Sequence, residues 1–143
     1  MKRVTGGLAV ALVLAAVAGC NTLGRQPRLD EPIINPTELK PGDTAVISVT
    51  VKDKHGIVRR VEGVVIEDAR IKFKLRDDGV APDVAAGDNI WTLQVDVPFQ
   101  APPGEFLLEL TAYRSDGTPV PVRSEEGTTV PLTTSIPVVI QNP

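Results

Sequence analysis

Apolar and polar residues alternate with a period of two along most of the chain. In residues 44–51, for example, Ala45, Ile47, Val49 and Val51 fall on one face and polar or small residues on the other. The same alternation recurs in 71–75, 91–97, 106–112 and 136–140. Period-two alternation with many β-branched residues is typical of half-buried antiparallel strands. The pattern therefore predicts a domain built from strands.

The inward phases of these runs define the expected hydrophobic core. It comprises Ile47, Val49, Phe73, Trp91, Leu93, Phe106, Leu108, Leu110 and Val138. A further strand is expected between Ile57 and Ile66, but Val61, Val64 and Val65 do not keep one phase, so its facing stays open.

Turn-forming pairs separate the runs, and no apolar pattern of helical period and length follows the first 19 residues. The pairs are Pro41-Gly42, His55-Gly56, Asp78-Gly79, Pro103-Gly104, Asp116-Gly117 and Glu126-Gly127. About seven short strands at this spacing predict an all-β, immunoglobulin-like antiparallel β-sandwich. A single cysteine rules out the Cys–Trp–Cys framework of antibody-type domains.

The first residues have the pattern of an export signal. Lys2 and Arg3 form a positive segment, and the uncharged apolar run Val4–Ala18 is too short to span a bilayer as a helix. The run ends in Val17-Ala18-Gly19-Cys20, which resembles the lipobox of bacterial lipoproteins. That resemblance implies a signal peptide at 1–19 and a diacylated Cys20 at the mature N-terminus. An ordinary signal peptide with an incidental cysteine is the alternative.

Removal of residues 1–19 leaves 124 residues, with 13 basic and 18 acidic side chains. This is long enough for one domain with a sizeable core, which we place at 32–143 after a lipidated tether at 20–31. The negative balance argues against nucleic-acid binding. With aromatic residues at 3%, no platform of stacked rings is expected for sugars or bases.

The segment LRDDGVAPDVAAGDNIWT, residues 75–92, concentrates four aspartates and two glycines. It resembles a stretch, D-D-G-x-x-x-D-x-x-A-G-D-G-x-[YW]-[TS], of Ig-like domains in bacterial surface and secreted proteins. The matching residues are Asp77, Asp78, Gly79, Asp83, Ala86, Gly87, Asp88, Trp91 and Thr92. Asn89 replaces the usual glycine, and asparagine tolerates a positive φ. The resemblance implies an extracytoplasmic β-sandwich and no reaction.

Two interpretations of this loop stay open. Aspartates cap turns by accepting backbone N–H groups, here Asp78 and Asp88, with Asn89 or Gly87 in the left-handed region. Alternatively, Asp77, Asp78, Asp83 and Asp88 supply oxygen ligands to Ca²⁺, although their spacing does not match an EF-hand. We favour the turn interpretation and expect no cofactor other than this Ca²⁺.

Other chemically interesting residues are few. Trp91 is expected to point into the core, whereas Tyr113 falls on the outward phase and marks a candidate contact surface. His55, the single histidine, lies in an expected turn, with no nucleophile motif in the sequence. We therefore expect a protein that is not an enzyme, and no small-molecule substrate is evident.

Together these features predict a lipid-anchored binding or structural module of the cell envelope, an accessory subunit of an envelope assembly. Its partners would be the membrane, through Cys20, and another envelope protein. Asn21 after Cys20 is not the aspartate that retains enteric lipoproteins at the inner membrane, so an outer-membrane location is favoured in a Gram-negative host. The alternatives are a calcium-dependent adhesion module and a small hydrolase using the Asp77–Asp88 loop.

Overall fold

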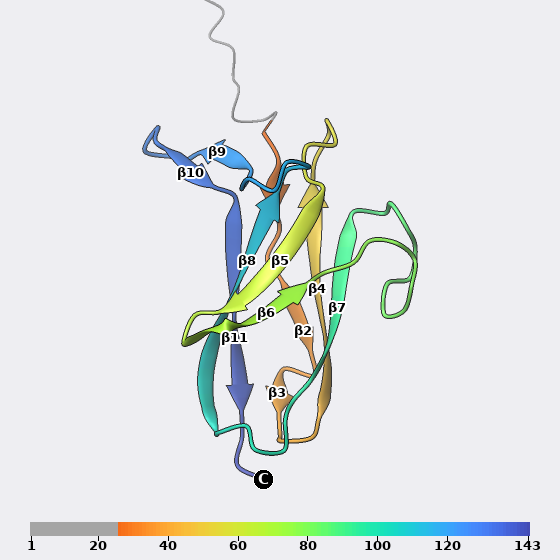
Figure 1. The fold of residues 1–143 in the computed structure, drawn as a ribbon, viewed down its shortest axis with the longest axis vertical. Coiled ribbons are helices and arrows are strands. Elements are labelled where there is room, and N and C mark those ends of the chain that lie inside the picture. The colour runs from red at the N-terminus through yellow and green to blue at the C-terminus, as the bar shows by residue number, and fades with distance from the viewer. Residues whose placement is uncertain (1–25) are drawn as a thin grey trace, which may run out of the picture.

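The computed structural model describes residues 26–143, and within them it contains strands and no helix. The expected signal peptide, Cys20 and the first part of the expected tether lie outside the described residues. Two β-sheets pack face to face into an elongated sandwich (Figure 1). In the part of the chain that the structure describes, no helix is long and apolar enough to cross a membrane.

The first sheet is built around the long central strand β4 (Thr44–Lys52). The short strands β1 (Arg28–Leu29) and β2 (Ile33–Asn35) pair with β4 at successive positions. Strand β7 (Ile90–Asp96) pairs with β4 over seven registered residues. All three pairs are antiparallel.

The second sheet has the strand order β3-β11-β8-β5-β6. Its strands are β3 (Glu38–Leu39), β5 (Arg60–Val65), β6 (Asp68–Lys74), β8 (Gly104–Tyr113) and β11 (Thr133–Ile140). The pairs are antiparallel except β3 with β11, which is parallel. A separate hairpin, β9 (Pro121–Arg123) with β10 (Thr129–Pro131), joins β8 to β11 at one end of the sandwich (Figure 1).

The expected all-β sandwich is thus confirmed. One pair departs from the antiparallel pattern, because β3 runs parallel to β11. The immunoglobulin-like connectivity stays a prediction.

Alternating burial along β4 and β8 explains why both sheets form here. Ala45, Ile47, Val49 and Val51 are buried along β4 and alternate with more exposed residues. Leu108, Leu110 and Ala112 do the same along β8. These two rows belong to one hydrophobic core between the sheets, and burial of each large aliphatic side chain contributes about 1.5–3 kcal/mol.

Most of the expected core residues lie in this core. Ile47, Val49, Leu108 and Leu110 are fully buried. Four more pack partly buried against them: Phe73, Trp91, Leu93 and Val138. Phe106 is half-buried at the margin.

The facing of β5, which the sequence left open, depends on a glycine. Val61 is fully buried, and Gly63 and Val65 follow it on the inward phase. A Cβ at Gly63 would lie 3.0 Å from Leu110 Cδ2 and 3.2 Å from Leu108 Cδ1. Glycine at this position therefore leaves room for the Leu108 and Leu110 side chains on the inner face of the sheet. The apolar Val64 and Ile66 are left on the outer phase.

Structure begins earlier in the chain than the expected boundary at residue 32. Arg28 and Leu29, which we expected in the tether, form β1 and pair with Lys52 and Val51 of β4. The Gln26 side chain also bonds to the Arg123 backbone: Nε2 donates to the carbonyl oxygen at 3.0 Å, and Oε1 accepts from the N–H at 2.8 Å. The folded domain therefore includes residues from at least Gln26.

Replacement of Leu108 by alanine tests the strand phase. Leu108 is only 2% exposed, so Leu108→Ala should lower the free energy of unfolding by about 2–5 kcal/mol. Denaturant unfolding of the full chain, followed by fluorescence of the single tryptophan Trp91, measures this change. The neighbouring Leu107→Ala is the matched control, because Leu107 is 37% exposed and should change stability much less. Equal losses for the two variants would contradict the assigned phase.

Candidate functional site

The aspartate-rich segment forms an ordered loop between β6 and β7, standing out from the side of the sandwich (Figure 1). Its two ends are tied together by backbone hydrogen bonds between Arg76 and Thr92, each N–H donating to the other's carbonyl at 2.8 Å. Leu75, just before the bridge, is buried in the core. The loop is therefore anchored where it leaves and where it rejoins the sheets.

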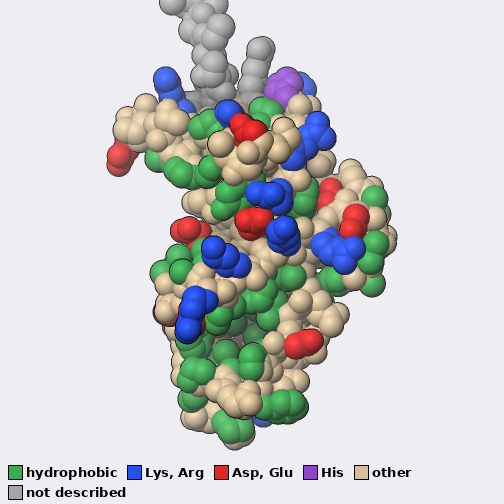
Figure 2. All heavy atoms as spheres, viewed as in Figure 1, with side chains coloured by type: hydrophobic (Ala, Val, Ile, Leu, Met, Phe, Trp, Pro, Cys, Tyr) green, Lys and Arg blue, Asp and Glu red, His purple; other side chains and the backbone are tan. Residues whose placement is uncertain are grey.

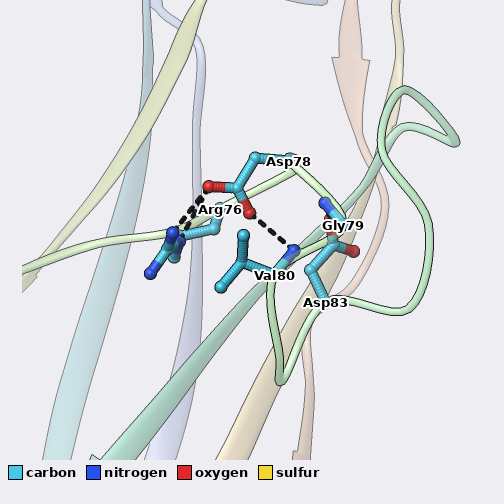
Figure 3. A network of polar contacts seen from close by, with 5 residues as sticks. All are labelled: Arg76, Asp78, Gly79, Val80 and Asp83. Atoms are coloured by element: carbon cyan, nitrogen blue, oxygen red, sulfur yellow. Dashed lines mark hydrogen bonds and ion pairs between the residues drawn. The ribbon is translucent and has the colours of Figure 1, made fainter.

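The first half of the loop is held by carboxylates that accept backbone N–H groups (Figure 3). Asp78 Oδ1 accepts from the Val80 amide at 3.0 Å, and Asp83 Oδ2 accepts from the Gly79 amide at 2.6 Å. The other Asp78 oxygen accepts from Arg76 Nη2 and Nε, at 2.7 and 3.0 Å. Both carboxylate oxygens of Asp78 are thus hydrogen-bonded, one to Arg76 and one to the Val80 amide of its own turn.

In the second half of the loop, carboxylates again accept backbone N–H groups, and two residues have a left-handed backbone conformation. Asp77 Oδ1 accepts from the Gly87 amide at 3.0 Å, and Asp88 Oδ1 accepts from the Ile90 amide at 2.9 Å. Gly87 has φ +74° and Asn89 has φ +63°. The expectations that Asp78 and Asp88 bond backbone amides and that Gly87 or Asn89 is left-handed are confirmed.

Three of the four suggested metal ligands come together. Asp77, Asp83 and Asp88 each offer a carboxylate oxygen, and the three oxygens lie within 4.8 Å of one another. Ligands on opposite sides of a calcium ion are about 5 Å apart, because Ca–O distances are about 2.3–2.6 Å. The group could therefore hold a metal ion. Asp78 is not part of it.

The carboxylates of Asp77, Asp83 and Asp88 are close enough to repel one another. Burial raises the pKa of Asp77, and hydrogen bonding to Asp88 together with repulsion from Asp88 and Asp83 raises it further. By contrast, hydrogen bonds from Arg76 and the Val80 amide lower the pKa of Asp78. A cation among the three carboxylates would relieve their repulsion, whereas Asp78 already has its counter-ion.

The other residues singled out in the sequence lie apart from this loop. Trp91 is half-buried at the start of β7 and packs against the core. Tyr113 is half-buried at the end of β8, with the Arg60 guanidinium 5.3 Å from its ring centroid. His55 is exposed in a turn next to Gly56. The structure brings neither Tyr113 nor His55 to the aspartates, and the contact role of Tyr113 stays a prediction.

A second site, which sequence reasoning missed, is a cavity of about 340 Å³ between the sheets. We call it the apolar groove. Its lining residues are Ile34, Leu39, Ala45, Ile47, Val65, Ile71, Phe73, Val95, Val97, Pro98, Gln100, Ala101, Pro102, Phe106, Leu108, Val138 and Ile140. Figure 2 shows hydrophobic side chains around a hollow below β6. Inward-facing strand positions normally indicate core, so alternation alone gives no signal that these ones border an opening.

Comparisons with known proteins give a likeness in fold and show no family or function. No protein-family model matches the chain, and no curated protein matches it. Among solved structures, it is similar to an endo-β-1,4-mannanase from Thermotoga petrophila, with 16% identity and a TM-score of 0.52 over 83% of this chain. The chain spans only 20% of that protein's length, so the likeness concerns one β-domain.

Two further structures are similar at lower scores. One is the alkylpurine DNA glycosylase AlkC of Pseudomonas fluorescens, with 12% identity, a TM-score of 0.48, and 81% and 30% of the two chains covered. The other is a Niemann-Pick type C2 protein from the Japanese carpenter ant, with 14% identity, a TM-score of 0.44, and 81% and 93% covered. Neither likeness carries an argument about function.

The left-handed conformation of Asn89 can be tested by substitution. Asn89→Gly should change stability little, because glycine adopts a φ of +63° without strain. Asn89→Val should destabilise the fold by about 1–3 kcal/mol, since a β-branched residue resists this region. Thermal unfolding of the two variants beside the unchanged chain gives the comparison. Equal stability of the valine and glycine variants would show that the loop does not depend on this conformation.

Proposed function

We propose that this chain is a lipid-anchored binding or structural module of the cell envelope, an accessory subunit of a larger envelope assembly. The lipobox-like Val17-Ala18-Gly19-Cys20 supports the anchor. The described residues support a non-catalytic role. Their only histidine is exposed in a turn, and the carboxylates of Asp77, Asp83 and Asp88 each accept a hydrogen bond from a backbone amide. Such a module acts by binding a partner and keeping it close to the membrane.

The observation that carries this proposal is the attachment of Gln26 to Arg123 of β9. It fixes the point where the chain enters the domain, at the end of the sandwich opposite to β3 and Pro143 (Figure 1). Cys20 is six residues before Gln26, so a fully extended connection spans at most about 20 Å. An anchor at Cys20 would therefore keep the β9–β10 end near the bilayer and present the β3 end away from it.

A second candidate function rests on the carboxylates of Asp77, Asp83 and Asp88. Their oxygens are hard ligands, which suit calcium rather than zinc. In this proposal Ca²⁺ stiffens the loop and makes adhesion to a partner calcium-dependent. The hydrolase alternative, which uses the Asp77–Asp88 loop, has no comparable support, because Asp78 is held by Arg76.

Mass spectrometry of the mature N-terminus tests the anchor. Cleavage should fall between Gly19 and Cys20, and Cys20 should carry the mass of a diacylglycerol. Cys20→Ser should abolish lipidation, because the hydroxyl is a poorer nucleophile than the thiol, whereas Asn21→Ser should leave it unchanged. An unmodified Cys20, or a cut elsewhere, would end the anchor proposal.

Thermal melts of the full chain with calcium and with a chelator test the metal. Calcium at 100 times its dissociation constant stabilises a protein by about 2.7 kcal/mol, which should raise Tm by roughly 10 °C for a domain of this size. Asp88→Asn should lose this shift but keep the bond to the Ile90 amide through its side-chain oxygen. Asp116→Asn, in a distant turn with the same bonding to Thr118, is the matched control. Identical melting curves with millimolar calcium and with chelator would contradict the metal proposal. The loop would then be held by its turn hydrogen bonds alone.

A further inference from the structure

We propose that the apolar groove binds a single-chain anionic amphiphile, a fatty acid of about twelve carbons. This inference deepens the proposed binding function by naming a ligand class, but it does not require that Cys20 be lipidated. It rests on four observations: the missing strand that leaves the groove open, the residues that line it, its size, and the charges that lie beside it.

The groove is open because two edge strands face each other without a strand between them. Among residues 26–143, strand β6 pairs only with β5, and β7 pairs only with β4 below the bridge at Thr92. The chain leaves β6 into the aspartate loop instead of adding another strand beside β7. As a result, the inward side chains of both strands are incompletely covered; Ile71 is 43% exposed, and Phe73 and Val95 are half-buried.

The chemistry of the lining selects an aliphatic chain. Ala45, Ile47 and Leu108, all buried, border the groove together with residues of both sheets, and Gln100 is the only polar residue in its lining. A polar ligand would lose its hydrogen bonds to water here without replacement. Each buried methylene group, in contrast, contributes about 0.8 kcal/mol.

The size of the groove limits the ligand to one chain. Its volume is about 340 Å³, within the usual range for small-molecule sites. A methylene group fills about the volume of a water molecule, roughly 30 Å³, so about eleven carbons fit. A phospholipid would have to place a second chain outside.

Positive side chains lie beside the opening. Along β6, Ile71 and Phe73 line the groove, while Arg70, Lys72 and Lys74 alternate on the other face. Figure 2 shows Lys and Arg side chains gathered above the hollow. Since β6 is the last strand of its sheet, the lysine stems can bend round its free edge and place their ammonium groups near the opening.

The two lysines are available for a ligand in a way that Arg70 is not. Arg70 is bound to Asp68 through two hydrogen bonds of 2.8 Å, and this pairing lowers the pKa of Asp68 to about 2. Among the ion pairs of residues 26–143, neither Lys72 nor Lys74 takes part. A ligand carboxylate at the opening would therefore meet unpaired positive charge.

The chain's own anchor is a poor candidate for this site. Gln26 is fixed against Arg123 near the β9–β10 end, whereas the groove reaches Leu39 and Ile140 at the opposite end (Figure 1). A strand from a partner protein, paired along the free edge of β7, is the competing occupant, and the experiment below distinguishes it.

The test is photolabelling of the full chain in membranes with a diazirine-bearing dodecanoic acid, followed by mass spectrometry of its peptides. Adducts should concentrate in peptides that contain β6 and residues 95–102. Ala101→Trp, which fills the groove, should reduce labelling at least tenfold. Ala85→Trp makes the same change on the exposed part of the aspartate loop and should leave labelling unchanged.

A second variant tests the charge and does not alter the groove lining. The double change Lys72→Glu and Lys74→Glu should reduce labelling by the fatty acid at least fivefold, but not labelling by a diazirine-bearing fatty alcohol of equal length. Lys54→Glu, in an exposed turn, should affect neither probe. Equal loss of both probes would contradict the predicted role of the lysines.

Three results would overturn the inference: adducts spread evenly over the chain, undiminished labelling of Ala101→Trp, or a cross-link from a photoreactive residue at position 101 to a protein with no fatty-acid adduct. The last result would identify a partner strand as the occupant. The same spectra report the lipid on Cys20, so failure of this inference is separable from failure of the anchor.

Discussion

The packing of β4 against β8 is the interaction on which the rest of the structure depends. Each strand presents an unbroken row of buried aliphatic residues, and together the rows form the centre of the core. Most other strands are arranged relative to these two, since β1, β2 and β7 pair with β4, and β5 and β11 pair with β8. With one cysteine in the sequence, no disulfide within the chain can assist. Stability therefore rests on burial and on the hydrogen bonds between paired strands.

Both candidate sites lie where this arrangement is incomplete. After β6 the chain does not continue the sheet, and the aspartate loop occupies the space beside the upper part of β7. Lower down no strand of the described part of the chain pairs with the free side of β7, and the apolar groove opens there. The loop and the groove are thus two results of one topological feature, the missing neighbour of β7.

The sequence predicted the long strands well because their burial repeats over many residues. β4, β7 and β8 correspond closely to the alternating runs, and the turn chemistry of Asp78, Asp88 and Asn89 followed from the preferences of those residues. These are local properties, which a single sequence contains. The short strands β1, β3 and β9 have two or three residues each, and their pairing depends on partners far away in the chain. No local pattern identifies them.

The candidate sites show the same limit. Thr92 is on the outward phase of β7, yet it is only 7% exposed. Its backbone pairs there with Arg76 of the aspartate loop. The meeting of Asp77, Asp83 and Asp88 likewise depends on how the loop closes. The groove combines residues from Ile34 to Ile140, and its openness results from a strand that is absent.

The long axis of the sandwich also has a mechanical consequence. The entry at Gln26 and the end of β11 lie at opposite ends of the molecule, and the strands between them run mainly along that axis (Figure 1). A pull between the two ends would slide β11 along β8, whose eight registered pairs share the load and break together. Such shear is resisted far more strongly than peeling, in which pairs break one after another. A load applied between the two ends of the sandwich would therefore be opposed by the whole β8–β11 ladder at once.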